Sequence, residues 1–285
     1  MKNVLELNGV SKKYPGFELN NISFTIPKGI ITGLIGENGA GKTTTIKAIL
    51  NIIKTEGTIK VFDKDNKKYE KEIKKDLGVV LDDSFLSDYL TAKGVNSIMK
   101  EFYENWDEKK YFNYLKEFKL PLNKLIKDFS SGMKMKIKIA AAISHNPKAL
   151  ILDEPTSGLD PIVRNEILDI FRKYIQEDEE RSILISSHIT TDLEHLSDYI
   201  IFIHEGKIIF NLQTDDLLEN YGVIKCDEND FKKIKKEDYI RYKKEKYHYE
   251  VLVKDKNYIK KTYNFNTVDK PSIDEIMLFY VKGEK

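Results

Sequence analysis

An eight-residue segment containing three glycines and a lysine is the strongest chemical signal in this sequence. Gly36–Thr43 reads GENGAGKT, which matches the phosphate-binding pattern G-x-x-x-x-G-K-[ST]. Glycines let such a loop turn tightly, so that successive backbone N–H groups point at phosphate oxygens. The ammonium of Lys42 can reach the β- and γ-phosphates of a nucleotide, and the Thr43 hydroxyl can coordinate Mg²⁺. For an isolated match, the alternative is a glycine-rich turn without a ligand.

The residues on either side of the loop supply the context that the pattern needs. Ile30–Ile35 is a short apolar run that predicts a strand, and Thr44–Ile52 has the spacing of a helix. The positive end of that helix would face the same anion as the loop. The residues expected to bind the nucleotide are Gly36, Asn38, Gly39, Ala40, Gly41, Lys42, Thr43 and Thr44.

Two adjacent carboxylates complete the predicted site. Ala149–Leu152 is an apolar run that predicts a buried strand, and Asp153 and Glu154 follow it. Ligands of parallel sheets bind beyond the carboxyl ends of the strands, where the phosphate loop also lies. We expect Asp153 to hold Mg²⁺ through water and Glu154 to orient or deprotonate the attacking water. The alternative is an acidic strand end without a catalytic role.

Two further motifs flank this strand and carry a resemblance to a known family. Phe129–Met133 reads FSSGM shortly before the strand, and Pro155–Asp160 reads PTSGLD directly after it. With these motifs, residues 1–220 resemble the ATPase subunit of ABC transporters. The resemblance implies ATP hydrolysis coupled to transport, with ATP and Mg²⁺ as cofactors. It also implies two partners, a transmembrane permease and a second, identical or different, ATPase subunit.

The resemblance assigns roles to several side chains outside the phosphate loop. Tyr14, in the predicted turn Lys12–Gly16, is similar to the aromatic residue that stacks on adenine, with Phe17 as the alternative. His188 resembles the switch histidine, which hydrogen-bonds the γ-phosphate. An exposed tyrosine in a turn and a structural histidine after a strand are the ordinary alternatives.

Other residues are similar to those that contact the second subunit. Ser130 and Gly132 resemble the signature motif, which opens a helix and reaches the γ-phosphate bound to the other subunit. Asp160 ends a segment similar to the loop that contacts that subunit. A helix-capping role for Ser130 is the alternative.

The sequence departs from the family pattern at two places. Phe129, Ser131 and Met133 stand where the family commonly has Leu, Gly and Gln. Asp82 stands where the family usually has a glutamine, and it adds a negative charge near the expected metal. Asp82 is therefore a candidate Mg²⁺ ligand, with helix capping as its alternative.

The pattern of predicted elements indicates an α/β protein. Its expected parts are a P-loop NTPase core with a mixed, mostly parallel sheet and an antiparallel N-terminal β subdomain, Val4–Val10 and Leu19–Ile26. A helical insertion is predicted at about residues 83–146. Residues 1–220 form the expected ATPase domain, and residues 221–285 form a small α+β appendage with two alternating runs, Tyr247–Val253 and Tyr258–Phe265.

Composition narrows the classes of partner and location. The 285 residues include 47 Lys and Arg against 46 Asp and Glu, so a net charge of +1 gives no reason to expect nucleic acid as a partner. A single cysteine, Cys226, fits a reducing compartment. No apolar run is long enough to cross a bilayer, and no signal peptide is visible. Together with these observations, the resemblance to a transporter subunit implies a peripheral protein at the cytoplasmic face of the cell membrane.

The signature and the helix after it suggest a subclass. Ser-Ser-Gly-Met-Lys, followed by a basic, alanine-rich helix, resembles the ABC-2 exporters of low-GC bacteria. Within that class it is most similar to exporters of antimicrobial or toxic peptides, including the phenol-soluble-modulin type.

Three rival classes fit the sequence less well. Ribosome-remodelling ATPases usually carry two ATPase domains, and chromosome-type ATPases need a long heptad insertion between Lys42 and Asp153. A regulatory module that binds ATP without hydrolysing it would not need Glu154 and His188.

Overall fold

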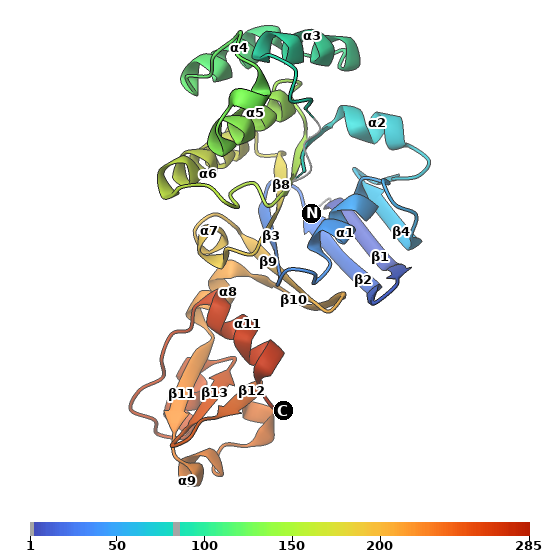
Figure 1. The fold of residues 1–285 in the computed structure, drawn as a ribbon. Coiled ribbons are helices and arrows are strands. Elements are labelled where there is room, and N and C mark those ends of the chain that lie inside the picture. Colours follow the sequence, from blue (N-terminus) through green and yellow to red (C-terminus); the bar gives the residue numbers. More distant parts are fainter. Residues whose placement is uncertain (1–2, 82–85) are drawn as a thin grey trace.

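A six-stranded sheet forms the centre of the structure, a computed structural model that describes residues 3–81 and 86–285 (Figure 1). Five strands are parallel to one another, and the sixth, β10 (Lys207–Gln213), lies at one edge and is antiparallel to its neighbour. In spatial order they are β10, β9 (Tyr199–His204), β3 (Ile31–Ile35), β8 (Ser182–Ser187), β7 (Ala149–Asp153) and β6 (Leu77–Val80). The parallel strands end at one edge, which therefore collects the residues that follow β3, β7 and β8.

A second, antiparallel sheet contains the N-terminal strands, as the sequence predicts. Its order is β2 (Phe17–Pro27), β1 (Asn3–Tyr14), β4 (Glu56–Val61) and β5 (Lys64–Asp65). Tyr14 ends β1 rather than lying in a turn, because its backbone pairs with Phe17. Helix α1 (Lys42–Ile49) packs its buried residues between this sheet and one face of the central sheet.

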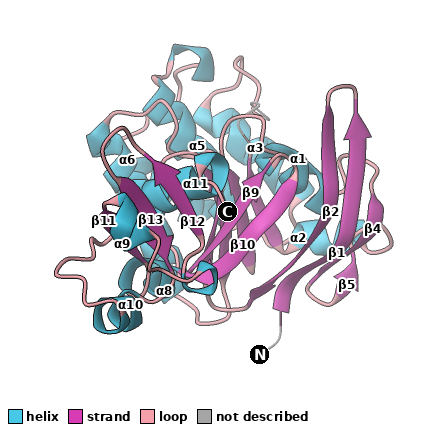
Figure 2. Cartoon of the chain, turned by 90° about the horizontal axis from the view of Figure 1, so that it is seen from below, coloured by secondary structure: helices cyan, strands magenta, loops and turns pink. Residues whose placement is uncertain are grey.

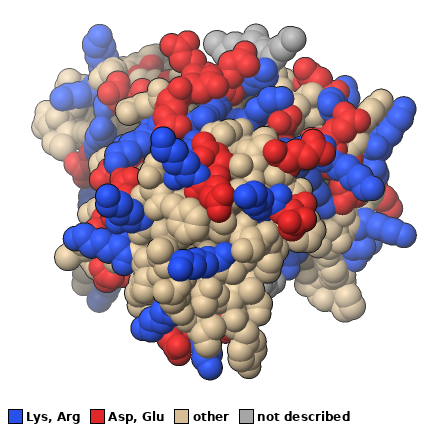
Figure 3. All heavy atoms as spheres, turned by 90° about the horizontal axis from the view of Figure 1, so that it is seen from above, with Lys and Arg blue, Asp and Glu red and all other residues tan. Residues whose placement is uncertain are grey.

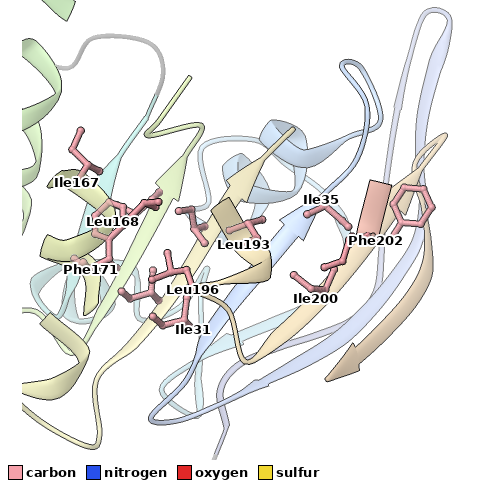
Figure 4. Packing of buried hydrophobic residues seen from close by; sticks show 14 of the residues in the cluster. Ile31, Ile35, Ile167, Leu168, Phe171, Leu193, Leu196, Ile200 and Phe202 are labelled. Atoms are coloured by element: carbon pink, nitrogen blue, oxygen red, sulfur yellow. The ribbon is translucent and has the colours of Figure 1, made fainter. Parts of the chain in front are cut away.

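The central strands are buried on both faces, which explains their continuous apolar sequences. In β7, Leu150 and Leu152 point to the core on one face, and Ala149 and Ile151 point to the other. Helices α6 (Pro161–Gln176) and α7 (Thr190–Glu194) cover the first face. Figure 4 shows this packing for Ile31, Ile35, Ile167, Leu168, Phe171, Leu193, Leu196, Ile200 and Phe202.

The predicted helical insertion is present between β6 and β7. The helices are α3 (Ala92–Phe102), α4 (Glu108–Glu117), a 3₁₀ turn (Ile126–Asp128) and α5 (Ser131–Ile143). They share a hydrophobic core of their own that includes Tyr111, Leu115 and Ile137. A short helix that the sequence pattern did not indicate, α2 (Glu70–Lys75), precedes β6.

His145 connects the end of the helical region to the central sheet. Its side chain is 1% exposed, its ring stacks on Tyr103 at 4.0 Å, and Nε2 lies 3.1 Å from the Leu77 carbonyl oxygen. A neutral ring satisfies this contact by donating from Nε2. Burial lowers the pKa of His145 from 6.5 to about 4, because the charged form would lose its hydration.

The low pKa of His145 predicts a loss of stability in mild acid. Above pH 6.5 the ring is neutral in both the folded and the unfolded chain. Between pH 6.5 and about 4 only the unfolded chain takes up the proton, so the free energy of unfolding falls by up to about 3 kcal/mol. Urea unfolding of wild type and His145→Gln at pH 7 and pH 5 measures this effect. We expect wild type to have the larger free energy of unfolding at pH 7, and this difference should be smaller at pH 5, because only wild type contains the histidine. A difference of unchanged size would contradict this prediction.

The C-terminal residues form a third sheet, with antiparallel order β11 (Gly222–Cys226), β13 (Tyr249–Val253) and β12 (Arg241–Lys244). Helix α11 (Ile273–Lys282) lies between this sheet and β9–β10, where the Tyr280 ring is 5.4 Å from the Phe210 ring. The first alternating run contains β13, whereas Tyr258–Phe265 overlaps the end of helix α10 (Lys256–Thr262). The remaining short helices are α8 (Thr214–Glu219), α9 (Glu228–Phe231) and a 3₁₀ turn (Lys236–Asp238).

The two smaller sheets lie on opposite sides of the central sheet (Figure 2). Seen from the end that carries α3 and α4, positive and negative side chains alternate around an uncharged area (Figure 3). Among the described residues, no helix combines the length and the hydrophobicity that a bilayer span requires.

Candidate nucleotide-binding site

The loop between β3 and α1 has a backbone that its glycines make possible. Gly39 and Gly41 have φ angles of 85° and 116°, which residues with a Cβ rarely adopt. At Gly36 a Cβ would lie 2.4 Å from the carbonyl oxygen of Ile203. The loop therefore needs glycine at these positions, two for backbone conformation and one for close packing against β9.

Lys42 lies inside this loop, with its side chain 6% exposed. Its Nζ donates to the carbonyl oxygens of Gly36 at 2.7 Å and Glu37 at 3.3 Å. The same ammonium forms an ion pair of 3.2 Å with Glu154 Oε1. The loop thus holds a buried cation next to the position where the sequence pattern predicts a phosphate group.

Asp153, the last residue of β7, is 1% exposed and accepts two hydroxyl hydrogen bonds. Thr43 Oγ1 donates to Oδ2 at 2.8 Å, and Ser186 Oγ donates to Oδ1 at 2.5 Å. Parallel pairing aligns Asp153 with Ser186 on β8. The structure therefore joins the phosphate loop to the acidic strand, as the sequence predicts, and adds a serine that the sequence reasoning did not select.

Glu154 lies between Lys42 and His188. Its Oε2 is 2.7 Å from His188 Nδ1 and accepts a hydrogen bond of 3.2 Å from the His188 backbone N–H. Its own backbone has a φ of 50°, an unfavourable value for a residue other than glycine. The Glu154 carboxylate thus faces the phosphate loop and contacts His188, the histidine that the family resemblance selects.

An open cleft of about 720 Å³ extends over these residues, within the range that small-molecule sites occupy. Phe17 borders it, whereas Tyr14 is not among the lining residues and its ring centroid lies 6.5 Å from that of Phe17. The lining residues are Gly16, Phe17, Glu37, Asn38, Gly39, Gly41, Lys42, Thr43, Thr44, Glu154, Ser157 and His188. A cleft lined by the ammonium group of Lys42 and the aromatic ring of Phe17 can accept a phosphorylated purine.

The residues that the resemblance associates with the second subunit, Ser130, Gly132 and Asp160, lie outside this cleft lining. Ser130 caps α5 by accepting the Met133 N–H, and Asp160 caps α6 by accepting the N–H groups of Ile162 and Val163. Gly132 is buried, and a Cβ there would lie 2.9 Å from a methyl group of Val163. The capping role considered for Ser130 is thus present. Asp82 lies outside the described residues.

A second polar cluster that the sequence reasoning missed joins α6 and α7 to the segment that follows the acidic strand. Asp192 is 5% exposed, accepts the Thr156 hydroxyl at 2.8 Å and pairs with Arg164. These residues come from three separate segments of the chain. No local pattern brings them together, so only a knowledge of the packing could have found them.

The geometry agrees with comparisons to known proteins. Residues 19–157 match the family model described as ABC transporter. Lantibiotic transport ATP-binding protein SrtF of Streptococcus pyogenes is 36% identical over 220 residues, which cover 74% of this chain and 92% of that protein. Bacitracin transport ATP-binding protein BcrA of Bacillus licheniformis is 34% identical, over 76% of this chain and 72% of that protein.

The fold agrees as well with a solved structure of an ATP-binding subunit of an ABC transporter. It is 27% identical, with a TM-score of 0.69, over 75% of this chain and 91% of that chain. The match to these relatives supports ATP as the nucleotide of the cleft. The chain belongs to the ABC transporter family, and it is an ATP-binding, ATP-hydrolysing subunit coupled to transport.

Proposed function

We propose that this subunit powers an exporter of antimicrobial or other toxic, amphipathic peptides, of the ABC-2 class. The support comes from relatives named for the transport of a lantibiotic and of bacitracin, both similar over about three quarters of this chain. Those names favour transport over the soluble alternatives, a ribosome-associated ATPase or a regulatory ATP-binding module. No substrate contacts this subunit in the proposed role, so its sequence carries no direct substrate signal.

The proposed hydrolytic site consists of Lys42, Thr43, Asp153, Glu154 and His188. The carboxylate of Asp153 and the hydroxyl of Thr43 are oxygen donors 2.8 Å apart, which suits the hard cation Mg²⁺. Among the described residues no cluster of three or more His, Cys, Asp or Glu could hold a metal, and Mg²⁺ at nucleotide sites commonly uses few protein ligands. The metal would neutralise charge on the phosphates.

The chain's own residues carry the remaining proposed steps. Lys42 binds the phosphates, and Glu154 orients or deprotonates the attacking water. His188, which contacts Glu154, hydrogen-bonds the γ-phosphate. The 3.2 Å Lys42–Glu154 ion pair is the observation that supports this proposal, because the residue proposed to bind phosphate contacts the residue proposed to act as general base. An ATPase assay of the purified chain, with and without Mg²⁺, tests the proposal, and a lack of Mg²⁺-dependent turnover contradicts it.

We further propose that two subunits close head to tail over two ATP molecules. Ser130, Gly132 and Asp160 lie outside the cleft lining of their own subunit. Ser130 is exposed at the start of the 13-residue helix α5. A serine hydroxyl and a helix N-terminus are groups that bind phosphate, so this end of α5 suits a nucleotide held by a second copy.

The proposed permease binds at an apolar groove between the helical region and the central sheet. The groove measures about 850 Å³ and is bordered by side chains of α2, α3, α5 and β6. Phe102 is 77% exposed and Ile98 is 38% exposed, although both are large and apolar. Contiguous exposed apolar residues indicate an interaction site. Binding there would hold the subunit at the cytoplasmic face of the membrane.

Replacing Phe102 with aspartate should uncouple ATP hydrolysis from export. Basal ATPase activity of the isolated subunit should stay within about twofold, because Phe102 lies outside the nucleotide cleft. Export should fall at least about tenfold, since a carboxylate in the groove would lose its hydration against an apolar partner. Tyr247→Asp is the control, because Tyr247 is a similarly exposed aromatic residue, at 82%, in the C-terminal sheet region. Normal export by the Phe102 variant would place the permease elsewhere.

We also propose a division into an ATPase domain, residues 1–220, and an accessory module, residues 221–285. The module's own hydrophobic cluster, which includes Ile224, Val251 and Ile259, supports this division. Helix α11 contributes Ile276 and Phe279 to the main core, and the module's sheet contributes Val223 and Leu252, so both pack against the ATPase domain.

A further inference from the structure

Ser186 contacts both of the carboxylate residues at the proposed hydrolytic site. Its hydroxyl donates to Asp153 Oδ1 at 2.5 Å and accepts the backbone N–H of Glu154 at 3.0 Å. Its carbonyl oxygen also accepts the Glu154 N–H, at 3.1 Å. One hydroxyl can donate one hydrogen bond and accept others, so these contacts are compatible. Ser186 is fully buried, which keeps water from replacing it.

These contacts act at two points where geometry matters for hydrolysis. Asp153 is 1% exposed, so its two oxygens depend on the hydroxyls of Thr43 and Ser186 for orientation. Glu154 has an unfavourable backbone φ of 50°, and such conformations persist where surrounding contacts hold them. Two acceptors on one residue, Ser186, hold the N–H of this backbone.

We propose that Ser186 is a positioning residue that sets the Mg²⁺ carboxylate and the water-activating carboxylate in one fixed relation. Without its hydroxyl, Asp153 Oδ1 loses a donor and is free to rotate toward another, and the Glu154 backbone keeps only its pairing to the Ser186 carbonyl. Asp153 then meets the metal in a range of orientations, and Glu154 meets the water in a range of positions. This inference rests on the proposed roles of Asp153 and Glu154.

Ser182 provides a matched comparison on the same strand. It is 1% exposed, and its hydroxyl accepts the Gly29 N–H at 3.1 Å at the opposite end of β8. Replacing either serine with alanine removes a buried hydroxyl from β8. Only Ser186 contacts the carboxylates, so a difference between the two variants reports positioning rather than the loss of a buried hydrogen bond.

The experiment compares wild type, Ser186→Ala and Ser182→Ala in two readouts. In hydrolysis, Ser186→Ala should lower kcat at least about tenfold, because displacements on the order of 1 Å at reacting groups have effects of that size or larger. It should also raise the Mg²⁺ concentration for half-maximal rate at least about threefold. In calorimetry with the non-hydrolysable analogue AMP-PNP, the affinity of Ser186→Ala without metal should stay within about twofold of the wild-type value. Adding Mg²⁺ should increase the affinity of the variant less than it increases that of wild type. Ser182→Ala should match wild type in both readouts.

A second substitution keeps the test decisive if Ser186→Ala does not fold. Ser186→Cys keeps the size of the side chain but replaces the hydroxyl with a weak donor, so it should show the same pattern. Glu154→Gln separates the two levels of the proposal. If Glu154→Gln hydrolyses ATP as wild type does, the proposed roles themselves are wrong. If it is slow while Ser186→Ala and Ser186→Cys behave like Ser182→Ala, only the positioning role of Ser186 is overturned.

Discussion

Glu154→Gln is expected to slow ATP hydrolysis at least about 100-fold while ATP affinity stays within about threefold. The amide keeps the size of the carboxylate but cannot accept a proton from water, and general bases contribute about 10²–10⁴-fold to such reactions. In this structure the carboxylate is 14% exposed, 3.2 Å from Lys42 and 2.7 Å from His188. Lys42 and His188 therefore hold the Glu154 carboxylate on the side of the cleft where we expect the phosphates, rather than in solvent.

Single-turnover hydrolysis and calorimetry on the same preparation measure the two quantities. Glu228→Gln serves as the control, because Glu228 forms a surface ion pair with Lys232 in α9, away from the cleft. Stopping hydrolysis should also preserve the closed pair of subunits, so light scattering of Glu154→Gln with Mg-ATP should detect a dimer. Hydrolysis at a normal rate would exclude Glu154 as the base, and a monomer at saturating ATP would contradict the closed pair.

Lys42→Ala is expected to weaken ATP binding at least about 100-fold, and hydrolysis would be lost as a consequence. The ammonium is held inside the loop by the carbonyl oxygens of Gly36 and Glu37, so it is already positioned for the phosphates. Two hydrogen bonds to a charged group, at about 1.5–3 kcal/mol each, account for an effect of that size. The alanine variant keeps the loop backbone but presents no cation to the phosphates.

Calorimetry with ATP measures the loss, and Lys60→Ala is the control for charge alone. Lys60 lies in β4 with its side chain 55% exposed, and its long contact with Glu6 contributes little. The contrast between Lys42→Ala and Glu154→Gln is the sharper test. The first should weaken ATP binding strongly and the second should leave it nearly unchanged, so an equal loss of affinity in both variants would contradict the separate roles.

Local features of the sequence were enough to locate the phosphate loop and the acidic strand. The glycine spacing in Gly36–Thr43 reflects backbone angles and close approaches within a few residues, so it is visible without a fold. Apolar runs such as Ala149–Leu152 reflect burial on both faces, and they indicate parallel strands directly. Tyr258–Phe265 shows the limit of this reasoning, because most of this short alternating run belongs to helix α10 rather than to a strand. Strand β12, Arg241–Lys244, was missed because three of its four residues are charged, so it shows no alternation of apolar and polar residues.

The sequence by itself determined the phosphate loop, the two carboxylates and most of the strands and helices of residues 1–220, because each depends on neighbours along the chain. The tertiary structure alone decided which distant side chains meet. Lys42 contacts Glu154, and Ser186 contacts Asp153, only because β3, β8 and β7 lie side by side in one register. It also placed Phe17, rather than Tyr14, at the cleft. A shift of register by one residue would turn these side chains to the opposite face, and no local pattern specifies register between strands so far apart in the chain.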